Sequence, residues 1–179
     1  MSRGEQVAPS LGAFVVEEEY TERDREGLLR AVRTARAALM RGDPPFGAVI
    51  TDAAGRERVS IGNTQISTAD VMAHAEFDAA RQAARTMPAR ELRGATLYST
   101  AEPCAMCAAA VYWSGIGRVV YAVGVGQLSA MFGHDEEYPF LNLPCRSVFA
   151  AGQRPTRLVG PTDLREAVDL WHEFLNRST

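Results

Sequence analysis

The chain has 179 residues and a formal net charge of −3, with 46% hydrophobic and 23% charged residues. This length fits a single domain with a sizeable core, and the composition is that of an ordinary globular protein. The slightly acidic balance provides no global positive field, so a nucleic acid is not the expected partner.

The cysteines and the first residues bear on the compartment. The chain has 3 cysteines, and two of them form a Cys-x-x-Cys spacing, which argues against a disulfide framework and for a reducing compartment. The first residues lack the basic and apolar regions of a secretory signal, and no apolar run approaches the roughly 20 residues that cross a bilayer. We therefore expect a cytoplasmic protein that has no membrane partner.

The first third of the chain predicts one helix and two strands. Residues 1–20 carry Gly, Pro and an acidic run, and we expect a loosely ordered lead-in there. Apolar residues recur at helical spacing over 21–40, and the turn residues at 42–45 end this helix. A short apolar run at 46–51 and a second run at 58–62 predict two strands joined by a turn.

The middle of the chain alternates between helices and strands. Residues 63–71 are expected to form a polar loop. An alanine-rich helix is predicted over 74–86 and a second helix over 104–114. Apolar runs at 95–100 and 118–123 predict two further strands.

The last part of the chain is less regular. Residues 124–155 scatter turn residues among apolar ones and predict no clear element, whereas 156–160 predict a strand and 163–176 an amphipathic helix. Strands that alternate with helices in this way predict the α/β class, a sandwich with helices on both faces of a sheet. We see no linker or repeat that would divide residues 21–179, so we expect one domain there.

Two short motifs carry the chemistry of the chain. The first is His74-Ala75-Glu76, and the second is Pro103-Cys104-Ala105-Met106-Cys107, a combination typical of zinc-dependent deaminases. Cys104 and Cys107 lie three residues apart at a helix start, so they project from one face and can bind one ion. The exposed N–H groups and positive dipole of that helix end favour the thiolate form, which binds metal. With His74, three protein ligands leave the fourth position of a zinc ion to water, as in catalytic zinc sites.

Glu76 is the expected catalytic residue. It follows His74 by only two residues, and such neighbours do not face the same way on a helix, so we do not expect both to bind the metal. A carboxylate beside a zinc-activated water can take its proton and return it later. We therefore expect Glu76 to move protons from water to a ring nitrogen and then to a departing amine.

Each motif alone has simpler explanations. A Cys-x-x-Cys pair often belongs to a structural zinc site or a redox pair. A structural site would need a fourth ligand, and His134, His172 and Cys145 do not stand in a ligand-like spacing. A binding module without catalysis is also possible in principle, but such a module has no use for the proton-transferring Glu76.

On these residues, the chain resembles the cytidine deaminase-like superfamily, in the branch that holds guanine deaminases and tRNA adenosine deaminases. The similarity covers Pro45–Val49, the Gly62-Asn63 pair, and Ala69–Glu76, where Val71 replaces the proline of the family segment. The resemblance implies a three-layer α/β/α sandwich with a five-stranded mixed sheet, a homodimer and a Zn²⁺ cofactor. It also implies zinc binding by His74, Cys104 and Cys107, with Glu76 as the proton shuttle.

The same resemblance suggests which residues contact the substrate. It implies that Asn63 hydrogen-bonds the substrate ring and that Ala75 lies beside it. Phe46 could stack on a flat ring, although a core position on a buried strand explains it equally well. Asp135 falls where guanine deaminases carry an acidic residue that reads a purine edge, but a solvated acidic turn is the explanation that we favour for it. The chain lacks the C-terminal tyrosine of guanine deaminases, which leaves strict guanine specificity open.

We therefore expect hydrolytic deamination of a small aminated heterocycle: guanine, a related purine base or nucleoside, or an s-triazine. The first alternative is a tRNA adenosine deaminase, and its discriminator is a basic surface for the anticodon loop. Further alternatives are a cytosine-type deaminase and an inactive binding module.

Overall fold

Six strands form one mixed sheet in the computed structural model, which describes residues 15–133 and 141–177. The strands are β1 (Val15–Glu17), β2 (Gly47–Thr51), β3 (Glu57–Gly62), β4 (Thr96–Ala101), β5 (Arg118–Val123) and β6 (Thr156–Val159). Their order across the sheet is β1-β6-β5-β4-β2-β3. Strand β2 is antiparallel to both β3 and β4, whereas β4, β5, β6 and β1 run parallel. All five predicted strands are therefore present.

The sixth strand corrects the expected number of five. Val15–Glu17 pairs in parallel with β6, and Val15 lies opposite Thr156. This strand belongs to the segment that we expected to be a loosely ordered lead-in, and residues 1–14 of that segment lie outside the described residues. A three-residue strand carries too little pattern to be predicted, since its partner strand lies near the other end of the chain.

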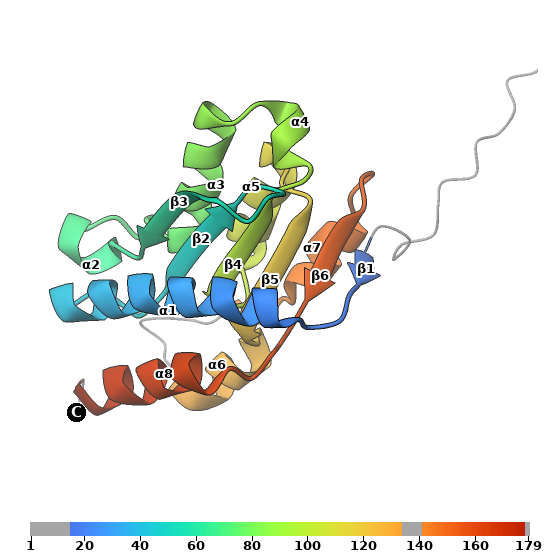
Figure 1. Ribbon diagram of the computed structural model, residues 1–179. Coiled ribbons are helices and arrows are strands. Elements are labelled where there is room, and N and C mark those ends of the chain that lie inside the picture. Colours follow the sequence, from blue (N-terminus) through green and yellow to red (C-terminus); the bar gives the residue numbers. More distant parts are fainter. Residues whose placement is uncertain (1–14, 134–140, 178–179) are drawn as a thin grey trace, which may run out of the picture.

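Helices cover both faces of the sheet (Figure 1). They are α1 (Glu22–Arg41), α2 (Gln65–Thr68), α3 (Ala75–Thr86), α4 (Ala89–Leu92), α5 (Ala105–Ser114), α6 (Val125–Phe132), α7 (Cys145–Ala150) and α8 (Arg165–Arg177). The predicted helices correspond to α1, α3, α5 and α8. Among the described residues, no helix is both long enough and apolar enough to cross a membrane.

Three short helices correct the predicted loops. Helix α2 lies within the expected polar loop 63–71, and α6 and α7 lie in the region 124–155 that showed no regular pattern. Helix α6 has 8 residues and α7 has 6. Helices of this length show too few turns for hydrophobic periodicity to identify them.

Alternation along the central strands divides the core into two layers. Val49, Tyr98 and Val120 face a cluster that includes buried residues of α1, α6 and α8. Their neighbours Ile50, Leu97 and Val119 face the other cluster, which includes residues of α3, α5 and α7. Because successive side chains of a strand point to opposite faces, these pairs bury both sides of the sheet. This confirms the predicted three-layer α/β/α sandwich.

Helix α1 packs closely on the strand that leads to the site. Thr21 and Asp24 form a capping box at its start, and Gly42 ends it with a left-handed φ of 92°. Where α1 crosses β2, a Cβ on Gly47 would lie 2.2 Å from the carbonyl oxygen of Ala31. Glycine at this position therefore allows the close approach that places the preceding residue, Phe46, beside the candidate site.

Candidate active site

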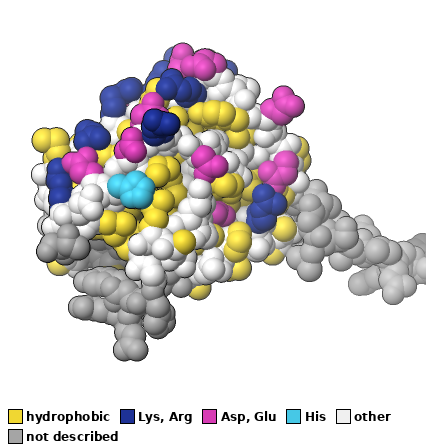
Figure 2. Space-filling view, turned by 90° about the horizontal axis from the view of Figure 1, so that it is seen from below, with side chains coloured by type: hydrophobic (Ala, Val, Ile, Leu, Met, Phe, Trp, Pro, Cys, Tyr) yellow, Lys and Arg dark blue, Asp and Glu magenta, His cyan; other side chains and the backbone are white. Residues whose placement is uncertain are grey.

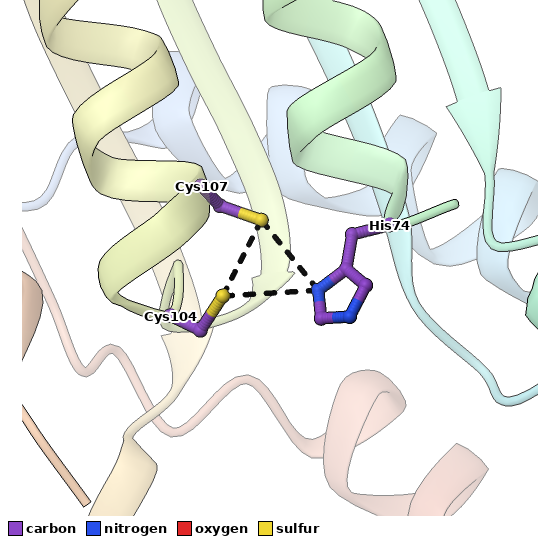
Figure 3. Close-up of side chains that lie close together, drawn as sticks. All are labelled: His74, Cys104 and Cys107. Carbon is purple, nitrogen blue, oxygen red and sulfur yellow. Dashed lines mark hydrogen bonds between the residues drawn. The ribbon is translucent and has the colours of Figure 1, made fainter. Parts of the chain in front are cut away.

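The three expected metal ligands come from the starts of two neighbouring helices (Figure 3). His74 is the N-cap residue of α3, Cys104 is the N-cap residue of α5, and Cys107 lies in the first turn of α5. Figure 3 shows the imidazole and the two sulfur atoms pointing toward one another. The two helix N-termini add exposed N–H groups and a positive dipole, which stabilise thiolates at this point.

The distances between these side chains fit a zinc ion. The Nδ1 atom of His74 lies 3.8 Å from the sulfur of Cys104 and 3.6 Å from the sulfur of Cys107, and the two sulfurs are 3.5 Å apart. A tetrahedral ion with Zn–S bonds of about 2.3 Å and a Zn–N bond of about 2.0 Å separates its ligand atoms by roughly 3.5–3.8 Å. His74, Cys104 and Cys107 are the only described residues that form such a cluster. Two thiolates and one imidazole are also a donor set that zinc prefers.

The pKa values of the two cysteine thiols shift in opposite directions. The hydrogen-bond contact between the two sulfurs lowers the pKa of Cys104 to about 4, whereas the same contact, together with burial, raises the pKa of Cys107. The hydrogen bond to Cys104 raises the pKa of His74. The contact therefore favours deprotonation of Cys104 over deprotonation of Cys107. Binding of a metal ion by both sulfurs displaces the remaining thiol proton.

Glu76 lies beside this cluster, in the first turn of α3. Its side chain is buried, and its Oε1 atom accepts a hydrogen bond of 2.6 Å from the hydroxyl of Ser99 on β4. Its Oε2 atom lies 4.0 Å from the sulfur of Cys107. Burial raises the pKa of the Glu76 carboxyl, although the hydrogen bond from Ser99 opposes this effect. A carboxyl with a raised pKa is suited to exchanging protons near neutral pH.

Phe46 connects the metal cluster to an aromatic wall. Its ring is nearly parallel to the imidazole of His74, with an angle of 9° and 6.4 Å between centroids. On its other side it meets the indole of Trp171 edge to face, with 4.6 Å between centroids. Trp171 on α8 also contacts Phe132 on α6 and Phe174 on α8. The aromatic wall, which we define as Phe46, Phe132, Trp171 and Phe174, therefore joins three separate parts of the chain.

Asn63 is fully buried and is held by Gln65. Its Oδ1 atom accepts the backbone N–H of Gln65, and its Nδ2 atom donates to the side chain of Gln65 across 2.7 Å. The side chain of Gln65 also lies 3.3 Å from the Nε2 atom of His74. The amide of Asn63 is thus oriented by a neighbour that also contacts the metal ligand.

The other two expected substrate contacts have different outcomes. Ala75 is buried at the first position of α3, between His74 and Glu76. Asp135 lies outside the described residues, so its expected role stays a prediction.

Two residues that contact the site, Ser99 and Gln65, were not among the predicted site residues. Ser99 could have been found, because alternation along the predicted strand 95–100 places it on the same face as Leu97. Gln65 gave no comparable signal, because it lies in a segment that we expected to be a loop and that forms the short helix α2.

The sequence of the site region matches a known family. Residues 21–123 match the family described as the cytidine and deoxycytidylate deaminase zinc-binding region. This range includes Glu76 and the cluster His74, Cys104 and Cys107, so the match covers the whole candidate metal site. It stops before α6, α7 and α8.

Individual relatives cover different shares of the chain and carry different names. A probable cytosine deaminase of Schizosaccharomyces pombe is 34% identical over 150 residues, which cover 84% of this chain and 91% of that protein. A tRNA-specific adenosine deaminase of Agrobacterium fabrum is 42% identical over 91 residues, covering 51% of this chain and 59% of that protein. The X-ray structure of guanine deaminase from Bacillus subtilis is similar with a TM-score of 0.56 and 30% identity, covering 83% of this chain and 93% of that chain. The names of these relatives refer to three different bases, so the family match leaves the substrate open.

Proposed function

The chain belongs to the cytidine and deoxycytidylate deaminase family, and we propose that it deaminates a small aminated heterocycle, with guanine or a related purine as the first candidate. The family and the donor set identify the protein as a zinc-type deaminase that hydrolyses C–N bonds. The choice of ring is our proposal. The observation that carries it is the aromatic wall beside the metal cluster.

Zinc held by His74, Cys104 and Cys107 would supply a water molecule of lowered pKa at its fourth position. Ser99 fixes one oxygen of Glu76 and leaves the other facing the cluster. Glu76 can therefore accept a proton from the attacking water and pass it to the ring nitrogen next to the reacting carbon.

The same carboxylate completes the reaction. Water adds its oxygen to the amino-bearing ring carbon, and the bond from that carbon to the exocyclic nitrogen breaks. Glu76 transfers the second proton of the water to the departing nitrogen, which leaves as ammonia. Because Glu76 is buried, bulk water does not compete for these protons.

The aromatic wall supports a flat and small substrate. Phe46 is half-buried and its ring is nearly parallel to the imidazole of His74, whereas the fully buried Trp171 meets Phe46 edge to face from the core. Aromatic side chains of this kind bind heterocyclic rings by stacking or by edge contacts. Phe46, Phe132 and Phe174 are half-buried and are therefore the members of the wall that a flat ring can contact, and Trp171 supports them from the core.

The charges on α8 also favour a small ring over a tRNA as the substrate. Glu173 pairs with Arg36 on α1 and with Arg177, and Glu166 pairs with Arg25. Figure 2, seen from the side of α8, shows acidic and basic side chains interspersed among apolar ones. A site for an anticodon loop would instead need unpaired cations along its border.

Cytosine is the second candidate ring. It is favoured by the Schizosaccharomyces pombe relative, because that match extends through 84% of this chain and 91% of that protein. A pyrimidine would fill less of the site than a purine but presents the same kind of amino-bearing carbon.

A homodimer is a further part of the proposal, since the resemblance implies one. Trp113 at the end of α5 is 83% exposed, and Val71 and Met72 before α3 are also exposed. Large exposed apolar side chains are frequent at protein interfaces. Light scattering on the purified protein would test this: a mass of two chains supports the dimer, and a mass of one chain refutes it.

The substrate is tested by incubating the zinc-loaded protein with guanine, guanosine, cytosine, adenine, ammeline and tRNA. Ammonia release and the mass of each product are measured. We expect ammonia and xanthine from guanine, whereas uracil from cytosine alone would favour the second candidate. Inosine in tRNA without reaction of any small ring would contradict the proposal.

A further inference from the structure

Glu102 holds the starts of two helices with one carboxylate. It follows the last residue of β4 and precedes Pro103 and the metal ligand Cys104. Its Oε2 atom accepts the backbone N–H of Val125 across 2.9 Å, and its Oε1 atom accepts that of Cys145 across 2.8 Å. Val125 and Cys145 are the first residues of α6 and α7. Each helix therefore has one of its otherwise unpaired N–H groups bound by the same side chain.

The two helices lie on opposite faces of the sheet. Helix α6 packs in the cluster of α1 and α8, whereas Cys145 and Phe149 of α7 are fully buried in the cluster of α3 and α5. Glu102 is thus bonded to both helical layers from the loop that carries Cys104. The carboxyl ends of β4 and β5 meet at this point, which is where α/β proteins place their ligand sites.

Helix α6 leads from Glu102 to the aromatic wall. Its last residue, Phe132, meets Trp171 edge to face with 5.5 Å between centroids, and Trp171 in turn meets Phe46. A shift at the start of α6 would therefore move one member of the wall relative to the metal cluster.

We propose that Glu102 is a positioning residue for substrate recognition, which fixes α6 and α7 relative to the zinc-binding loop. This inference rests on the proposed function, because it assumes that the aromatic wall contacts the substrate. The carboxylate of Glu102 bonds the backbone of Val125 and Cys145, and among the described residues no hydrogen bond joins it to a metal ligand. Its effect is on how well the wall fits the ring, and hence on KM more than on kcat.

The chemistry of the contact demands a carboxylate. Two N–H donors need two acceptor oxygens, and Glu102→Gln replaces one of them with an NH₂ group that is itself a donor. The substitution keeps the size of the side chain, so a role in filling space would survive it. Gln127→Ala is the second variant: Gln127 accepts the N–H of Gly124 at the start of α6 and donates to Asp163 before α8, and neither contact involves α7. Glu91→Gln on α4 is the matched control, since Glu91 is a partly exposed glutamate that pairs with Arg58.

The test combines hydrogen exchange, zinc content and steady-state kinetics. For Glu102→Gln we expect amide exchange in the first turns of both α6 and α7 to accelerate, with zinc content unchanged. On a ring that the wild type deaminates, we expect KM to rise roughly tenfold or more while kcat changes far less. Gln127→Ala should accelerate exchange in α6 but not in α7, and Glu91→Gln should match the wild type.

Unchanged exchange in either helix, or an unchanged KM, would overturn the inference. Loss of zinc from Glu102→Gln would also overturn it, because Glu102 would then support the metal site and not the wall. If the wild type deaminates none of the rings, the proposed function fails. The exchange measurement still decides whether Glu102 holds the two helices.

Discussion

Ser99 donates a hydrogen bond of 2.6 Å to Glu76, and both side chains are buried. The bond joins the middle of a central strand to the first turn of α3. Because it fixes the Oε1 atom of Glu76, the Oε2 atom is the one that lies near the sulfur of Cys107. The strand thereby determines which oxygen of the carboxylate can exchange protons at the metal cluster.

Ser99→Ala should slow turnover without removing zinc. A hydrogen bond to a charged group contributes about 1.5–3 kcal/mol, so losing it at the transition state lowers kcat/KM by roughly 10- to 100-fold. The measurement is kcat/KM with zinc content determined in parallel. Ser60→Ala is the control, because Ser60 is exposed on β3 and its hydroxyl lies 2.8 Å from the hydroxyl of Thr34 on α1, away from Glu76. Equal rates for Ser99→Ala and the control would show that Glu76 needs no support from β4.

Cys104→Ser should lower zinc content, because it removes one of three protein ligands. Cys145→Ala is the matched control: Cys145 is a buried cysteine in α7 and is not part of the cluster. Metal analysis after brief chelation should show little zinc in Cys104→Ser and wild-type zinc in Cys145→Ala. Equal zinc retention by both variants would contradict the assigned ligand set.

Asp24 should stabilise the fold in a manner that depends on pH. Burial acts to raise the pKa of this carboxyl, but hydrogen bonds from Arg118 and Thr21 outweigh it, so the pKa is lowered. The unfolded value is about 3.9, so the stabilisation is present above that pH and is lost as pH falls through the lower folded pKa. Asp24→Asn keeps an acceptor for the cap of α1 but removes the charge that Arg118 pairs with.

Urea unfolding at pH 7, 5 and 3 measures this effect. We expect Asp24→Asn to lower the free energy of unfolding by about 3 kcal/mol at pH 7 and pH 5, as for a buried ion pair that loses one partner. The difference from the wild type should shrink at pH 3. A difference that stays constant over this range would contradict the role of the charge.

The fold was predictable where the sequence carried a long or alternating pattern. The helices over 21–40 and 163–176 and the five strands β2 to β6 could be predicted because each buries one face or both faces in a regular repeat. Strand β1 and helices α6 and α7 depend on distant partners instead. The N–H groups that begin α6 and α7 are bound by Glu102, which no local sequence pattern indicates.

The candidate site also has one part that could be predicted from the sequence and one part that could not. His74, Cys104 and Cys107 could be predicted, because their motifs stand at the starts of two predicted helices. The fold brings these two helix starts together. The aromatic wall could not, since Phe46, Phe132 and Trp171 come from three distant segments. Their contact depends on how α6 and α8 pack against α1, and that arrangement is a property of the whole fold.

The central claim is that Glu76 moves protons at a zinc site formed by His74, Cys104 and Cys107. Its most direct test is ammonia release by Glu76→Gln, measured on protein whose zinc content matches that of the wild type. Removal of a general acid and base lowers the rate by roughly 10²- to 10⁴-fold, so we expect full zinc occupancy with turnover reduced by that factor. Glu76→Gln with full zinc and wild-type turnover would contradict the account.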